Sequence, residues 1–295
     1  MFTILVLFGL GLVLGSFVGA QVWRLRLRQL REDKAAGELQ PEDDVELKRL
    51  SVLHSKGVAT DRSKCLQCSH TLAWYDLLPL ISWVSTRGRC RYCKQFIGWF
   101  EPAIELSLAS VFVVSYLVWP FEFDSVYAVG AFIVWLIGLT LGAILWVYDK
   151  RWFLLPDRIN FALIAVAALY ALVHIIDGEV SVGDVALALI VFSGVYGSLY
   201  YFSRWQYGIQ NTWVGFGDVK LSIALALFAL EWQYAFLAIL LANVLGTLLV
   251  LPGLATGKIK RGAHIPFGPL LLIGTALSVL FGAQIIDWYL GLFLL

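Results

Sequence analysis

Charged residues are scarce in this chain, and their scarcity excludes an ordinary soluble protein. Asp, Glu, Lys and Arg make up 15% of the 295 residues, whereas hydrophobic residues make up 60%. The mean hydropathy is +0.78. A soluble domain typically carries about 25% charged residues and does not need so much apolar surface for its core. The composition therefore indicates a membrane protein.

The residue patterns of several enzyme classes are also missing. The sequence contains no glycine-rich phosphate loop and no serine–histidine arrangement of the kind that supports nucleophilic catalysis. No nucleic-acid partner is expected. These absences favour a non-enzymatic membrane protein or an enzyme that works with carboxylates alone.

Apolar runs long enough to cross a membrane recur along the chain. Crossing about 30 Å of hydrocarbon takes about 20 helical residues. The sequence predicts eight such segments, at 2–23, 102–120, 126–148, 159–176, 183–203, 217–230, 232–252 and 267–290. The sixth is short for a span. The first has no basic residues before it and no small-residue cleavage site, so we expect it to remain as a helix.

Basic residues are absent from every second connection between these segments. Arginines follow the first segment directly, which places the N-terminus outside and the next loop in the cytoplasm. All 22 Lys and Arg then fall at Lys220 or in the cytoplasmic segments 24–101, 149–158, 204–217 and 253–266. We therefore expect a multi-pass protein of the cytoplasmic membrane, surrounded by lipid.

The long cytoplasmic loop contains all four cysteines, in two Cys-x-x-Cys pairs. Two such pairs can place four thiolates tetrahedrally around Zn²⁺, and the alternative is a pair of disulfides. A cytoplasmic loop is reducing, which favours structural zinc. His70 lies two residues after Cys68 and is a possible competing ligand, but four thiolates already fill the coordination shell. The predicted ligands are Cys65, Cys68, Cys90 and Cys93. Residues 29–63 before them read as a short surface helix or a flexible insert with no recognisable chemistry.

Three aspartates at the predicted cytoplasmic ends of spans are candidates for chemistry. Asp218 follows Gly215 and Gly217, whose lack of Cβ atoms suits a site that admits an extended peptide. The alternative is a helix start in which Asp218 is an N-terminal charge. Asp149 ends the third span, and Asp157 is interpreted as the N-cap of the fourth.

The predicted topology puts Asp149 and Asp218 on the same side of the membrane. Two close carboxylates cannot both ionise easily, so they share one proton. The ionised one can deprotonate a water while the protonated one polarises a scissile carbonyl. This arrangement is that of an aspartyl protease.

At these residues the sequence resembles the type IV prepilin peptidases, a GxGD family of membrane aspartyl proteases. The similar stretches are Gly15-Ser16-Phe17, the two cysteine pairs with Ser82-Trp83 and Arg87-Gly88-Arg89-Cys90, Pro102 to Glu105, Asp149 with Leu155-Pro156-Asp157, Gly215 to Lys220, and Ile265 to Pro269. The resemblance implies that Asp149 and Asp218 form the catalytic pair. It implies accessory roles for Asp157, Gly215, Gly217, Lys220 and Glu105.

The resemblance also implies a substrate and a second activity. Family members remove the basic leader peptide of prepilins or pseudopilins after a glycine, at the cytoplasmic face. Many then methylate the new N-terminus with S-adenosylmethionine, an activity associated with the cysteine-bearing loop. This chain has Val18-Gly19-Ala20 where the family has an asparagine, and Arg24-Leu25-Arg26 where it has a proline. A peptidase without methyl transfer, and a non-enzymatic scaffold or transporter with a zinc knuckle, are the alternatives.

The expected fold is all-α: a polytopic bundle of about eight transmembrane helices with a small zinc-ribbon-like loop domain. We expect a first helix at 1–24, the cytoplasmic loop at 25–101, and a peptidase domain at 102–295. Glu105 lies about one turn inside the second span, where an unpaired carboxylate is disfavoured. We expect it either to face a polar cavity or to pair with an arginine of the preceding loop.

Overall fold

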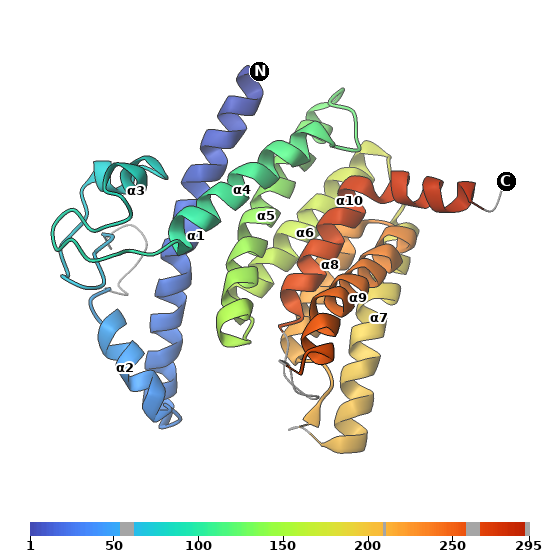
Figure 1. The fold of residues 1–295 in the computed structure, drawn as a ribbon. Helices are drawn as coiled ribbons and strands as arrows, with labels where there is room; N and C mark the ends of the chain where they lie inside the picture. The colour runs from blue at the N-terminus through green and yellow to red at the C-terminus, as the bar shows by residue number, and fades with distance from the viewer. Residues whose placement is uncertain (54–61, 209–210, 258–265, 293–295) are drawn as a thin grey trace. The chain divides into compact units, whose positions relative to one another are not determined.

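The computed structural model describes residues 1–53, 62–208, 211–257 and 266–292, and its regular elements there are helices (Figure 1). The chain divides into two compact units, Met1–Tyr116 and Leu117–Leu295. The expected all-α fold is confirmed. Residues 258–265, which include most of the predicted cytoplasmic segment 253–266 and Ile265 of the last family stretch, lie outside the described residues.

The first unit is built on one long helix. Helix α1 spans Phe2–Ala36 and is followed by α2 (Pro41–Leu50), η1 (Trp74–Leu77), α3 (Ile81–Ser85) and α4 (Phe100–Leu117). The predicted first span is therefore only the N-terminal part of α1. The helix continues through the arginine-rich stretch because nothing there breaks it, and it ends at Gly37, whose φ of 75° is left-handed.

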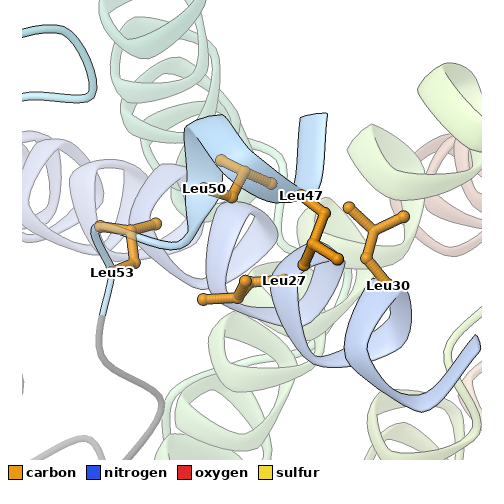
Figure 2. Packing of buried hydrophobic residues seen from close by; sticks show 5 residues of the cluster. All are labelled: Leu27, Leu30, Leu47, Leu50 and Leu53. Carbon is orange, nitrogen blue, oxygen red and sulfur yellow. The ribbon is translucent and has the colours of Figure 1, made fainter. Parts of the chain in front are cut away.

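Helix α2 folds back onto the C-terminal part of α1, so part of the polar insert is an ordered helix. Five leucines fill the contact (Figure 2): Leu27, Leu30, Leu47, Leu50 and Leu53. Arg26 is 5% exposed, and it donates to Asp43 at 2.6 Å and to Glu46 at 2.8 Å. A buried guanidinium is tolerated only with such partners.

Helices α1 and α4 pack closely because glycines line the contact. A Cβ added at Gly11 would lie 2.4 Å from the Cα of Ala109, and one at Gly15 would lie 2.5 Å from the Cα of Glu105. Small residues spaced four apart let helix backbones approach in a membrane, where the hydrophobic effect does not hold helices together. Gly15 of the Gly15-Ser16-Phe17 stretch therefore has a packing role.

The second unit is a helix bundle. Its helices are α5 (Val126–Trp152), α6 (Asp157–Asp177), α7 (Val182–Tyr207), α8 (Phe216–Ala229), α9 (Trp232–Ala255) and α10 (Gly268–Gly291). In the part of the chain that is described, seven helices are long and apolar enough to cross a membrane. Helix α8, the predicted sixth span, has 14 residues. At 1.5 Å per residue it is shorter than the hydrocarbon layer of about 30 Å.

Helix α8 is surrounded by other helices of its unit. It contacts α6, α7, α9 and α10, and its side chains are largely buried. Phe228 of α8 packs so closely on α5 that a Cβ at Gly138 would lie 2.4 Å from its ring. The buried residues of α8 begin at Leu221, so its C-terminal part is the part enclosed by the other helices.

Candidate functional site

Asp149 lies near the C-terminal end of α5 and is 6% exposed. The backbone N–H of Gly268, the first residue of α10, donates to its Oδ2 at 3.1 Å. A Cβ at Gly268 would lie 2.7 Å from the same oxygen, so only glycine fits here without displacing the carboxyl group. Helix α5 then ends at Phe153, whose left-handed φ is 56°. The carboxyl group is thus fixed by a backbone donor from a distant segment.

Asp218 lies in the first turn of α8, after the N-cap residue Gly215. Its Oδ2 accepts the Gly215 N–H at 3.3 Å. Asp218 is therefore a charge in the first turn of a helix, as one of the two interpretations had it, and a carboxylate at this end complements the helix dipole. That local role does not exclude a second one.

The structure brings Asp149 and Asp218 together, as the topology predicted. The two carboxyl groups are close enough to interact electrostatically. Leu155, from the turn between α5 and α6, packs between the backbones that hold them. A Cβ at Gly217 would lie 3.1 Å from the Leu155 Cβ, and one at Gly268 would lie 3.4 Å from its Cδ2. Gly217 therefore serves close approach to Leu155 rather than an unusual φ, and an added Cβ would have to displace Leu155 slightly.

Asp157 was predicted to be an N-cap, and that prediction is wrong. Pro156 is the N-cap of α6, since its carbonyl accepts the first helical hydrogen bond from the Asn160 N–H at 3.0 Å. Asp157 is the first helical residue, and its side chain is free to accept from Lys220 of α8 at 2.7 Å. This ion pair ties α6 to the helix that carries Asp218.

Asn160 also ties α6 to the Asp218 segment, and the sequence analysis missed it. Its side chain is fully buried, and its Nδ2 donates to the Gly217 carbonyl at 3.1 Å. The available signal was a polar amide at the second position of the predicted span 159–176, where polar side chains are disfavoured unless they form hydrogen bonds.

The four cysteines form a compact cluster within the first unit. Their sulfur atoms all lie within 4.8 Å of one another, and all four thiols are free, which argues against the disulfide alternative. His70 is not part of the cluster; its ring stacks 3.6 Å from that of Tyr92. Four thiols at these separations could hold a zinc ion.

The two cysteine pairs are built alike. Each first cysteine accepts, through its carbonyl, a backbone N–H at 2.9 Å: Ser69 donates to Cys65, and Lys94 donates to Cys90. Ser69 and Lys94 both have a φ of 61°. Burial would raise the pKa of Cys90. The backbone N–H groups of Cys93 and Tyr92 donate to its sulfur, however, and lower the pKa to about 7. This thiol therefore ionises readily near neutral pH.

Glu105 is buried against α1, and its partners differ from those expected. It accepts the backbone N–H of Leu80 at 2.8 Å and bonds the Ser16 hydroxyl, whereas no arginine of the described loop pairs with it. Leu80 has a left-handed φ of 54°. Glu105 thus fixes a strained turn of the cysteine-bearing loop onto the α1–α4 pair.

Glu101 lies one turn before Glu105 on α4. Its Oε1 accepts the Trp23 indole N–H at 3.3 Å, while its Oε2 is buried without a partner in the described chain. A Cβ added at Gly19 would lie 3.8 Å from the Glu101 Cγ, an ordinary contact. The space beside Gly19 would therefore admit a larger side chain next to a carboxylate oxygen that lacks a donor.

Two family models match the chain. The bacterial Peptidase A24 N-terminal domain matches residues 9–119, and the type IV leader peptidase family matches residues 136–251. The matches fall on the two units described above.

Curated relatives match over nearly the whole chain. A prepilin leader peptidase/N-methyltransferase of Aeromonas hydrophila is 30% identical over 99% of this chain and 95% of its own length. One from Pseudomonas aeruginosa is 29% identical over 95% of this chain and 91% of its own length. A type 4 prepilin-like proteins leader peptide-processing enzyme of Escherichia coli is 30% identical, covering 90% and 88%. No solved structure matches the chain.

Proposed function

We propose, from the premise that this chain belongs to the type IV leader peptidase family, that it cleaves prepilins or pseudopilins with an aspartyl mechanism. The chain is an enzyme and a multi-pass membrane protein. The proposed reaction is hydrolysis of the peptide bond after a glycine, which removes a basic leader at the cytoplasmic face of the membrane. This orientation puts the N-terminus outside.

The observation that carries the proposal is the approach of Asp149 and Asp218 within one unit. With one proton between them, the ionised carboxylate removes a proton from water and the protonated one donates to the carbonyl oxygen of the scissile bond. Water adds to the carbonyl carbon, and the tetrahedral intermediate then releases the new amine, which takes up a proton. The Gly268 N–H keeps Asp149 in place through these steps.

The accessory residues hold the segments that carry the pair. The Asp157–Lys220 ion pair and the Asn160–Gly217 hydrogen bond both join α6 to the start of α8. The Asp157 side chain is 59% exposed, and such pairs contribute little, about 0–1 kcal/mol. We therefore assign Asp157 a supporting role rather than a place in the chemistry.

We propose structural zinc at Cys65, Cys68, Cys90 and Cys93. The small loop has little core of its own, and a metal supplies the missing folding free energy. Glu105 then joins this loop to the α1–α4 helix pair through the Leu80 N–H. In this assignment residues 25–101 form one functional segment, which includes the C-terminal part of α1, and residues 102–295 form the peptidase segment. The boundary between the two compact units lies later, after Tyr116.

We also propose methyl transfer to the new N-terminus, carried by the first unit. S-adenosylmethionine, when bound, supplies an electrophilic methyl group on a cationic sulfonium. The buried Glu101 Oε2 fits a cationic ligand, because an unpartnered carboxylate oxygen is costly without a donor or a positive charge. Glu105 and Ser16 stand one turn further along the same helix contact.

Mass spectrometry of a pilin-like substrate after incubation with purified enzyme and labelled S-adenosylmethionine tests the proposal. We expect a cut and methylated N-terminus. A cut but unlabelled product would reduce the protein to a peptidase, and an intact substrate would leave the scaffold or transporter alternative. Loss of methylation in Glu105→Gln, with pre-cleaved peptide still methylated by Asp149→Asn, would establish two separable sites.

A further inference from the structure

The cysteine-bearing loop exposes large apolar side chains. In the short helix α3, Ile81 is 65% exposed and Val84 is 66% exposed. Trp99, the residue before α4, is also 66% exposed. Residues three apart lie on one face of a helix, so Ile81 and Val84 form a single apolar face. An apolar face of this kind marks a surface that binds another apolar body.

Two hydrogen bonds fix α3 against the start of α4. The backbone N–H of Leu80, the N-cap of α3, donates to Oε2 of Glu105 at 2.8 Å. The indole N–H of Trp83 donates to the Gly98 carbonyl at 2.8 Å. The centre of the Trp83 ring also lies 4.2 Å from that of Trp99. The apolar face of α3 is therefore held at a fixed level along α4.

That level lies at the end of a membrane span. Helix α4 is long and apolar enough to cross a membrane. Its 18 residues extend about 27 Å, slightly less than the hydrocarbon layer of about 30 Å, so its first residues lie at the membrane boundary. Glu105 lies about 8 Å along α4 from Phe100, which places the start of α3 close to that boundary. Tryptophans such as Trp99 are enriched at the same level.

The same segment carries an excess of positive charge. Residues 81–99 contain no Asp or Glu. The exposed basic residues there are Arg87, Arg89, Arg91 and Lys94. Arg91 pairs with Asp76 at 3.0 Å, and the segment stays positive when that pair is counted as neutral. Exposed apolar side chains beside basic ones are suited to a surface of anionic lipid.

We propose that the apolar face of α3 docks on the surface of the bilayer, and that the exposed basic residues after it bind the headgroups of anionic lipids. Docking holds the cysteine cluster against the membrane instead of leaving it free in solution. Lipid binding by this loop does not depend on the proposed peptidase chemistry. The opposing interpretation is that a protein partner covers the apolar face.

Spin labels in the full-length protein, reconstituted in lipid nanodiscs, test the proposal. Val84 is replaced by p-acetylphenylalanine, which carries the nitroxide without involving the four cysteines. Val45 of α2 is the matched control, because it is also an exposed valine of the first unit, at 71%, but has the acidic neighbours Asp44 and Glu46. In nanodiscs that contain phosphatidylglycerol, the label at position 84 should collide with oxygen, which concentrates in lipid, and be shielded from a water-soluble nickel chelate. The label at position 45 should stay open to the chelate.

The lipid composition separates docking on anionic headgroups from other causes of shielding. In nanodiscs of phosphatidylcholine alone, the shielding at position 84 should decrease, because the basic residues lose their anionic partners. Equal shielding in both lipids overturns the binding of anionic headgroups. A label at position 84 that is as open to the chelate as the one at position 45 overturns the docking. Shielding from both oxygen and the chelate overturns it too, because burial under protein excludes both reagents.

Hydrogen exchange of the unlabelled protein provides a second measurement in case the label disturbs α3. The backbone amides of α3 should exchange more slowly in nanodiscs with phosphatidylglycerol than in those of phosphatidylcholine. Arg87→Gln combined with Arg89→Gln should remove this difference, whereas Arg49→Gln, at an exposed position of α2, should keep it. Equal exchange of the wild-type protein in the two lipids contradicts the proposal.

Discussion

Gly268→Ala is the substitution whose effect follows most directly from the geometry of the acid pair. The added Cβ would lie 2.7 Å from Oδ2 of Asp149, whereas ordinary contacts begin at 3.4 Å. Either the carboxyl group or the start of α10 must therefore move by about 0.7 Å, and the 3.1 Å hydrogen bond to the Gly268 N–H is stretched or lost. A displacement of this order at a catalytic group costs up to about 100-fold in rate.

The assay is turnover of a pilin-like substrate by purified Gly268→Ala enzyme in detergent or liposomes. We expect kcat to fall by about 10-fold to 100-fold while the protein remains folded. Gly130→Ala is the matched control, since Gly130 lies on the same helix as Asp149 and a Cβ there meets nothing within 4 Å. Wild-type kcat in Gly268→Ala would refute the assignment of this glycine as the support of Asp149.

Three further predictions concern the first unit. Gly15→Ala should destabilise the protein by about 1–3 kcal/mol, because its Cβ would press on the α4 backbone; thermal unfolding should show no such loss for Gly9→Ala, where the space is open. Elemental analysis should find about one zinc per chain, and Cys90→Ser should lose the metal. Burial opposes ionisation of Asp76, but Arg91 and other donors hold its pKa below the ordinary value. The contribution of Asp76 to the free energy of unfolding should therefore be present above about pH 4 and be lost as the pH falls further. Thermal unfolding of Asp76→Asn at a series of pH values should lack this pH dependence.

The long apolar helices could be predicted because their hydropathy sets them apart from the segments between them. Each of the eight predicted spans coincides with a helix. The ends were less predictable. The arginines after residue 23 lower hydropathy without breaking helix, so α1 continues to Gly37, where a left-handed residue becomes necessary.

The site was predictable only where charged side chains define it. Asp149 and Asp218 could be paired from topology, because both end spans on the same predicted side. The hydrogen bond that holds Asp149 could not be predicted, since its donor is the backbone N–H of Gly268, and every residue except proline has such a group. Asp157 was misassigned because a residue after Pro156 resembles an N-cap, whereas the proline itself caps α6 and frees the aspartate for Lys220.

Cleavage by single and double acid-pair variants tests the central claim most directly. Asp149→Asn and Asp218→Asn should each abolish turnover while the protein stays folded and inserted, and the double variant should be no worse than either single one, because the pair acts as a unit. Asp157→Asn should only weaken turnover. Near wild-type cleavage by either Asp149→Asn or Asp218→Asn would contradict the account.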